Sequence, residues 1–395
     1  MLQVSMSQRW VTAVVAVGVA ALFVGKAATA YVQGRKKDAL LNKLPKSLLL
    51  WRVPPNAKDE YEIWLHLDAT LRKAGLTRWT VIDECSQHTP ERSDVFPSGY
   101  LHATPVRGTD GQAGSTPRLR GFCTTNSSSH VVRTHEGQDA VVRVVAIGDE
   151  GREQFRIWRE LATAPHALIS ANHTLPLLQE LNMEHITLGV FPLVSHSLDS
   201  LYGFWAKSSV GDILDAIMQA LEALAYIHSL RIAHRDAFKH NFVAQWHSES
   251  LSTGKMPVSK PRIYLVDFET AIQFPESCPS SERLCTGLPL AGSVSDPARY
   301  KSPRIPEMET GQPYDPFKLD VWQLGHSFLD FDSTIPTVQE VLHSMASSDP
   351  AQRLTADEAL SRLRSLVENM PPKSLLIPPV LYSDEDMASA DMSME

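Results

Sequence analysis

The sequence has few cysteines and no excess of basic residues, and both features reduce the number of function classes that fit. The 395 residues include four cysteines, with no Cys-x2-Cys pair and no histidine at zinc-binding spacing. We therefore expect reduced thiols in a cytosolic compartment. The formal net charge is −8 and the longest basic run is Arg35-Lys36-Lys37, so a nucleic-acid backbone is not expected as the main partner. The cysteines are Cys85, Cys123, Cys278 and Cys285.

Charge is also absent from a long stretch near the N-terminus. Residues 10–25 carry no charge, and between there and Gly34 only Lys26 interrupts the stretch. A segment of this length can cross a bilayer once if Lys26 extends toward the interface. Basic residues are denser after the stretch than before it, so the positive-inside rule leaves the remaining chain in the cytosol. The alternative is a cleaved signal peptide ending near 28–30, which would place the chain outside the cell.

Hydrophobic periodicity predicts a series of helices and strands after this segment. The clearest helix covers 209–228, where a Ser-Val-Gly-Asp cap precedes apolar residues at helical spacing. Two short apolar segments, 242–246 and 262–266, flank a polar insertion and are expected to pair as a hairpin. Residues 77–130 contain repeated prolines and glycines, which indicate long loops with a few short strands. Other helices are predicted at 57–74, at 150–162 and from Thr355, and other strands at 140–145 and 186–191.

The most informative segment is 234–241, which reads His-Arg-Asp-Ala-Phe-Lys-His-Asn. A short apolar strand after it leads to Asp267, followed by Phe and Glu. An Asp, an Asn and a second Asp in this order can serve phosphoryl transfer. Asp236 can orient an attacking hydroxyl and accept its proton, while Asn241 and Asp267 can hold magnesium against nucleotide phosphates. The predicted hairpin carries Asn241 and Asp267 at its two ends, which would bring both side chains to one cleft.

Three later motifs extend this pattern: Arg-Ile-Pro-Glu at 304–307, Asp-Val-Trp-Gln-Leu-Gly at 320–325 and Asp-Pro-Ala-Gln-Arg at 349–353. With the segments above, they make residues 131–370 resemble the eukaryotic protein-kinase domain. The wording around the second motif looks most like the expanded kinase-like proteins of mushroom-forming fungi. The resemblance implies an α+β, two-lobed protein kinase-like fold, with a small β-rich lobe and a large mainly helical lobe. It also implies a buried ion pair between Glu307 and Arg353.

The resemblance further implies roles for individual residues. Asp236 corresponds to the catalytic base, and Asn241 and Asp267 correspond to the magnesium ligands. Arg143 stands where the family has a strand lysine on the ATP phosphates. Arg235 is the position that, in the family, binds a phosphorylated activation segment through charge-assisted hydrogen bonds. ATP and Mg²⁺ are the implied cofactors, and the implied substrate is a protein whose identity the sequence leaves open.

The predicted small lobe departs from the family pattern at several positions, which we keep as candidate nucleotide-contacting residues. The helix position that should pair with the strand lysine holds Gln154, although Arg143 could still meet the adjacent Glu153 if the helix rotated slightly. No G-x-G-x-x-G loop precedes the strand of Arg143. Lys239 lies one position later than the catalytic-loop lysine of Ser/Thr kinases. Glu269 replaces the usual glycine after Asp-Phe, which adds a negative charge near the predicted metal site.

Three function classes fit these residues. An ATP-dependent Ser/Thr protein kinase is favoured because the base, two metal ligands and a cation for the phosphates are all present. A pseudokinase scaffold, which binds partners without turnover, is favoured by the departures. A small-molecule kinase shares the Asp, Asn and Asp set but usually carries His-Gly-Asp and lacks the Asp-x-Trp-x-x-Gly helix. The expected organisation is a transmembrane anchor at 1–34, a juxtamembrane helix and loop-rich extension at 35–130, a kinase-like domain at 131–370, and a proline-rich, acidic, disordered tail at 371–395.

Overall fold

The structure is a computed structural model that combines helices with β-sheets. It describes residues 26, 28, 31–32, 35, 39–53, 57–81, 86–88, 121–123, 127–194, 196–203, 206, 209–245 and 261–383. Among these residues no helix has both the length and the apolar character needed to cross a membrane. The uncharged stretch at 10–25, on which the predicted anchor rests, lies outside the described residues, and so does the acidic end of the predicted tail.

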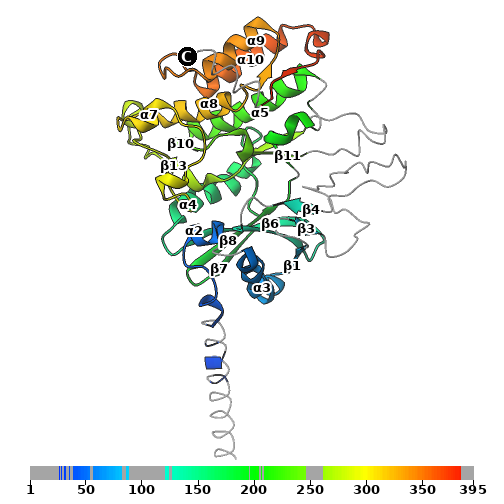
Figure 1. Ribbon diagram of the computed structural model, residues 1–395, viewed down its shortest axis with the longest axis vertical. Coiled ribbons are helices and arrows are strands. Elements are labelled where there is room, and N and C mark those ends of the chain that lie inside the picture. Colours follow the sequence, from blue (N-terminus) through cyan, green and yellow to red (C-terminus); the bar gives the residue numbers. More distant parts are fainter. Residues whose placement is uncertain are drawn as a thin grey trace, which may run out of the picture.

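A curled antiparallel sheet of five strands forms one part of the molecule (Figure 1). The strands are β1 (Leu76–Arg78), β5 (Ser129–Thr134), β6 (Asp139–Ile147), β7 (Gln179–Met183) and β8 (Ile186–Pro192). Their order across the sheet is β1-β5-β6-β8-β7, so β6 lies at the centre. The strands predicted at 140–145 and 186–191 are confirmed as β6 and β8. The sheet also takes in β1, which precedes residue 131.

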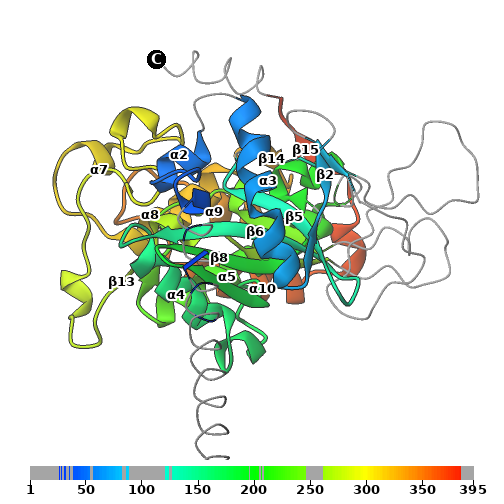
Figure 2. The same ribbon diagram turned by 90° about the horizontal axis from the view of Figure 1, so that it is seen from below.

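The two faces of this sheet contact different helices, because side chains alternate along a strand. Val142 and Val144 of β6 belong to one apolar core together with residues of α2 (Leu48–Arg52) and α3 (Ala57–Lys73), which lie over that face (Figure 2). The helix predicted at 57–74 is therefore confirmed as α3. Val145 belongs to a second core with α4 (Arg152–Ala162), the helix predicted at 150–162. Arg143, which alternates with Val142 and Val144, faces the rest of the molecule.

Helix α5 (Val210–Ser229) is the centre of the second, mainly helical part of the molecule. The predicted cap is present, because the Ser209 hydroxyl accepts a hydrogen bond from the Asp212 N–H at 3.2 Å. Helix α10 (Ala356–Glu368) is the helix predicted from Thr355; it packs against α5 and begins with a capping box between Thr355 and Glu358. The remaining helices here are α7 (Pro306–Glu309), α8 (Pro316–His326) and α9 (Pro336–Met345).

Short strands and single 3-10 turns make up the other described elements. The short strands are β2 (Thr80–Val81), β3 (Ser86–His88), β4 (Gly121–Cys123), β9 (His196–Ser197), β10 (Ile232–Ala233), β11 (Phe242–Gln245), β12 (Arg262–Leu265), β13 (Ile272–Gln273), β14 (Phe331–Asp332) and β15 (Val380–Leu381). The 3-10 turns are η1 (His166–Leu168), η2 (Leu198–Gly203), η3 (Lys239–Asn241), η4 (Phe268–Thr270), η5 (Ser280–Glu282), η6 (Pro297–Arg299) and η7 (Pro372–Leu375). Strands β2 to β4 form a small separate sheet, in line with the few strands expected between 77 and 130.

A bidentate ion pair joins two distant segments of the helical part. Both guanidinium nitrogens of Arg353 contact the Glu307 carboxylate, at 2.9 and 3.1 Å, and the Arg353 side chain is completely buried. This is the pair that the resemblance implied. Two parallel hydrogen bonds fix both position and orientation, so the segment around α7 is held firmly to the start of α10.

Residues 371–383 contact the helical part, although the sequence analysis assigned them to a disordered tail. The Val210 N–H donates to the Ile377 carbonyl at 2.9 Å, and the Ser209 hydroxyl donates to the Leu375 carbonyl at 3.1 Å. Both apolar side chains also pack against the core around α5. Proline-rich segments lack helix periodicity, and here isolated apolar side chains provide the docking instead. The rest of the predicted tail, from residue 384 on, lies outside the described residues.

Candidate functional site

The hairpin of β11 and β12 places the two predicted metal ligands, Asn241 and Asp267, at the same end of the hairpin. Phe242 pairs with Leu265 across the antiparallel strands, so Asn241 and Val266 lie at the same end of the hairpin. The Val266 N–H donates to the Asn241 carbonyl at 2.9 Å, and Asp267 follows directly. The predicted pairing of these strands is therefore confirmed.

Two side chains of α8 fix the backbone of residues 234–241, which we call the predicted catalytic loop. The Asp320 carboxylate accepts from the N–H groups of His234 and Arg235, at 2.8 and 2.6 Å. The Gln323 amide accepts from the Ala237 N–H at 2.8 Å and donates to the Arg235 carbonyl at 3.0 Å. Both α8 side chains are buried, and Arg235 has a positive φ of 69°. A non-glycine residue in this region is costly, so the loop conformation is maintained by these bonds.

Asp236 lies in this loop with its carboxylate partly accessible. Its side chain is 25% exposed, which leaves room for a substrate hydroxyl. The Asn241 amide donates to Asp236 Oδ2 and to the Asp236 carbonyl, both at 2.8 Å, and the Ser302 hydroxyl lies 3.5 Å from Oδ1. Because both Asn241 amide protons are used in these bonds, its Oδ1 is the atom available to a cation. The geometry is compatible with a base at Asp236 and an oxygen ligand at Asn241.

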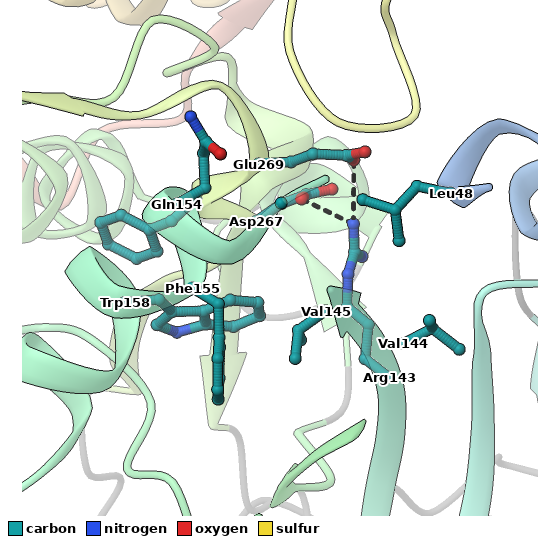
Figure 3. Close-up of a pocket in the computed structure, with 11 residues that line it drawn as sticks. Leu48, Arg143, Val144, Val145, Gln154, Phe155, Trp158, Asp267 and Glu269 are labelled. Atoms are coloured by element: carbon teal, nitrogen blue, oxygen red, sulfur yellow. Dashed lines mark hydrogen bonds and ion pairs between the residues drawn. The ribbon is translucent and has the colours of Figure 1, made fainter. Parts of the chain in front are cut away.

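Asp267 is paired with Arg143, the arginine at the centre of the sheet. Arg143 Nη2 lies 2.6 Å from Asp267 Oδ1 and 3.3 Å from Glu269 Oε2, and Figure 3 shows the guanidinium pointing at both carboxylates. Asp267 has a left-handed backbone, with φ 63° and ψ 61°. Burial by itself would raise the pKa of Asp267, but the nearby guanidinium groups of Arg143 and Arg52 outweigh it and lower the pKa. Asp267 is therefore ionised and balanced by arginine.

Glu269 has the opposite shift. Burial raises its pKa, and the neighbouring Asp267 carboxylate raises it further, while Arg143 and the hydrogen bond from Ser293 act in the other direction. Its Oε1 accepts from the Ser293 N–H and its Oε2 contacts both Arg143 and Arg52, each at 3.3 Å. Glu269 therefore contacts three separate segments, which contain Arg52, Arg143 and Ser293.

Two further candidates lie elsewhere than the sequence analysis suggested. Glu153 pairs with Arg156 on the outer side of α4, at 2.7 Å and 62% exposed, so the suggested contact between Arg143 and Glu153 is wrong. The physical reason is that Glu153 faces solvent, whereas Arg143 already has two buried carboxylate partners. Gln154 does face inward, and it lines the same cavity as Arg143 without meeting the guanidinium (Figure 3).

Lys239 also has partners of its own. Its ammonium group contacts the Asp330 carboxylate and lies 5.3 Å from the centre of the Tyr202 ring. Lys239 lies one position later than the lysine of Ser/Thr kinases, and its side chain points toward the helical part of the molecule. In this arrangement Lys239 is a structural residue, and Arg143 is the cation beside the predicted metal ligands.

The Arg235 guanidinium is buried beneath the segment that follows Asp267. Its contacts include long ones to the carbonyl oxygens of Thr270, at 3.5 Å, and Leu288, at 3.4 Å. Within the described part of the chain its Nε has no hydrogen-bond partner. A role in binding a phosphorylated activation segment stays a prediction.

A cavity of about 20 Å³ lies beside Arg143, between β6, α4 and the Asp267 segment (Figure 3). A space of roughly 10–15 Å³ holds one water molecule, so the enclosed part of this cavity holds about one. Nη2 of Arg143, which contacts both carboxylates, would have to leave them before it could contact nucleotide phosphates. The lining residues are Leu48, Arg143, Val144, Val145, Gly151, Gln154, Phe155, Trp158, Asp267, Phe268 and Glu269.

A nucleotide site also needs metal ligands and a loop for the phosphates, and only the described residues can be searched for them. Among them no cluster of three or more His, Cys, Asp or Glu side chains is arranged to hold a metal ion. Magnesium bound with a nucleotide needs only one or two protein carboxylates besides phosphate and water, so Asn241 and Asp267 suit it in donor type. Gly108, Gly111 and Gly114, which are expected to lie in an ordinary loop, are outside the described residues.

Sequence reasoning missed Arg52 and the two anchors on α8. Arg52 precedes the motifs at 234–241 and beyond by a long stretch of chain, and no local pattern indicated its contact with Glu269. Asp320 and Gln323 were quoted as part of a motif, but their hydrogen bonds to the predicted catalytic loop depend on long-range folding.

Comparison with known proteins does not identify this chain. No protein-family model matches the sequence, and no curated protein matches it. The argument about function therefore depends on the residues themselves.

Proposed function

We propose that the chain has a two-lobed protein kinase-like fold and transfers the γ-phosphoryl group of ATP to a Ser or Thr hydroxyl of a protein. The sheet with α2 to α4 would be the small lobe, and the helical part the large lobe. The observation that carries the proposal is the arrangement around the β11–β12 hairpin: Asp236 hydrogen-bonded to Asn241, and Asp267 facing Arg143. The bidentate pair of Glu307 and Arg353 supports the same family likeness.

In the proposed reaction the protein mainly positions groups and balances charge. The oxygen of the substrate hydroxyl bonds to the γ-phosphorus while Asp236 accepts the hydroxyl proton. The bond between the γ-phosphorus and the bridging oxygen of ADP breaks, and ADP leaves. Asn241 Oδ1 and the Asp267 carboxylate would hold Mg²⁺, which neutralises phosphate charge when it is bound. Arg143 would move from Asp267 to the phosphates. Its planar guanidinium can make two parallel hydrogen bonds to phosphate oxygens.

A pseudokinase scaffold is the second candidate, and one observation favours it. Arg143 lies 2.6 Å from Asp267 and the adjoining cavity measures about 20 Å³, so the metal-binding carboxylate already has a positive partner without any ligand. If this pairing is too stable to open, the chain would keep the kinase-like shape without binding Mg²⁺ and ATP.

The proposed location follows from the sequence alone. The uncharged stretch at 10–25, with more basic residues after it than before it, supports a single-pass anchor that leaves the kinase-like region in the cytosol. Cytosolic ATP would then be available to the site.

Phosphate transfer from ATP to a generic protein substrate tests the proposal, with Asp236→Asn beside the wild-type protein. Loss of a general base costs about 10²–10⁴ in rate, so we expect the variant to lose activity by that factor while its circular dichroism stays unchanged. Asp149→Asn is the matched control, because Asp149 is fully exposed and its removal should leave the rate unchanged. Equal rates in the Asp236 variant and the wild type would contradict the assignment. No transfer by the wild-type protein would favour the scaffold.

A further inference from the structure

Helix α2 connects the N-terminal segment to the predicted metal-binding face. Trp51 is completely buried, and its ring meets the Trp64 ring edge-on, with centres 5.6 Å apart. The Leu48 N–H donates to Glu150 Oε2 at 3.0 Å, just before α4 begins. A Cβ atom at Gly151 would lie 2.8 Å from Leu48 Cδ1, so α2 lies directly against the turn that starts α4. Apolar burial and the Leu48 hydrogen bond therefore dock the first residues of α2, and Arg52 adds an ionic contact at the last residue of the helix.

Arg52, the last residue of α2, extends from this docked helix to the opposite side of the site. Its Nη1 lies 3.3 Å from Glu269 Oε2 and 2.9 Å from the Ser293 hydroxyl oxygen. The backbone around Ser293 also presses on the glutamate, because a Cβ atom at Gly292 would lie 2.5 Å from Glu269 Cγ. Arg52 thereby joins the N-terminal segment, the residue after Asp-Phe and the segment that contains Ser293.

The cluster that results contains two arginines and two carboxylates: Arg52, Arg143, Asp267 and Glu269. Arg143 contacts both carboxylates, whereas Arg52 contacts only Glu269. The four charges balance in the absence of any ligand. A divalent cation at Asp267 would add two positive charges beside both arginines, so it would compete with them for the same two carboxylates.

We propose that Arg52 is a positioning residue that couples the docking of α2 to the loading of the metal-binding face, an inference that rests on the proposed function. Binding of magnesium and nucleotide weakens the contact between Arg52 and Glu269 and loosens the end of α2. By reciprocity, the contact between Arg52 and Glu269 weakens metal-linked nucleotide binding, so removal of the Arg52 charge strengthens that binding. The docking of α2 and the binding of nucleotide phosphates therefore influence each other through the guanidinium group of Arg52.

The test is the binding of a fluorescent ATP analogue to the full chain, with magnesium and with a chelator. The Kd with chelator divided by the Kd with magnesium reports the contribution of the metal. This ratio cancels any direct effect of Arg52 on the phosphates. We expect Arg52→Ala to raise this ratio by about three- to tenfold, because one unit charge beside two carboxylates is removed. Arg52→Lys keeps the charge and should stay near the wild-type ratio. Ser293→Ala should raise the ratio less than Arg52→Ala does.

Arg72→Ala is the matched control, since Arg72 forms an exposed ion pair with Asp68 at 2.8 Å, away from the site. Amide hydrogen exchange of 44–53 gives a second readout: magnesium and the analogue should raise exchange in the wild type but not in Arg52→Ala. Unchanged ratios in the Arg52 and Ser293 variants, with magnesium-dependent binding in the wild type, would overturn this inference alone. A wild-type protein that gains nothing from magnesium would overturn both this inference and the proposed function.

Discussion

Asp320 and Asp267 both lie beside the predicted catalytic loop, but they have different kinds of partner. Asp320 is completely buried, accepts from two backbone N–H groups and contacts the His228 ring at 2.9 Å. Asp267 is 20% exposed and its close partner is the Arg143 guanidinium. The partners of Asp320 are mostly fixed parts of the main chain. The partner of Asp267 is a long side chain that can move away.

This difference separates the scaffold of the site from the face that would bind ligands. Backbone donors that lose a buried acceptor cannot find another one, so the hydrogen bonds of Asp320 maintain one loop conformation. A guanidinium can exchange one carboxylate for another, or for a phosphate, without leaving a charge unpaired. The helical part therefore supplies a loop held by fixed hydrogen bonds, and the sheet supplies a side-chain counter-charge.

The largest expected effect is that of Asp320→Ala. The change leaves two buried N–H groups without an acceptor, and we expect the free energy of unfolding to fall by about 3 kcal/mol. Urea unfolding followed by circular dichroism measures this loss. Asp149→Ala, at an exposed position, should change stability by less than about 0.5 kcal/mol. A loss of similar size for the two variants would show that Asp320 does not hold the loop.

A smaller effect is expected for Asp267→Ala in the absence of ligands. Arg143 keeps Glu269 as a partner, and the repulsion between the two carboxylates disappears, so the loss should be about 1 kcal/mol. The same urea experiment measures it. If Asp267→Ala costs as much as Asp320→Ala, the two aspartates are equally structural, and the contrast between scaffold and ligand-binding face is wrong.

Local patterns in the sequence predicted most of the regular elements. The caps at Ser209 and Thr355, the periodicity of α3 and α5 and the pairing of β11 with β12 are all present, because each depends on neighbouring residues. The order Asp236, Asn241, Asp267 likewise placed three side chains around one hairpin. The Glu307–Arg353 pair, which the resemblance to protein kinases implied, is also present.

Long-range packing decided the features that the sequence did not reveal. Glu153 and Arg143 have opposite charges and suitable spacing, but the rotation of α4 places Glu153 in solvent. The one-residue shift of Lys239 was visible, yet its partner Asp330 comes from a distant segment. Arg52 had no motif at all, and only the docking of α2 brings it to Glu269.

The most direct test is the stability of the protein with and without ATP and magnesium, beside Asp267→Ala. At a hundredfold excess of ligand over Kd, binding should raise the free energy of unfolding by about 2.7 kcal/mol, seen as a higher melting temperature. We predict a rise in the wild-type protein that requires magnesium and is absent in the variant. No rise at millimolar nucleotide, in a protein that melts cooperatively, would contradict the proposal that Asp267 binds magnesium with ATP. The pseudokinase scaffold would then be the better account.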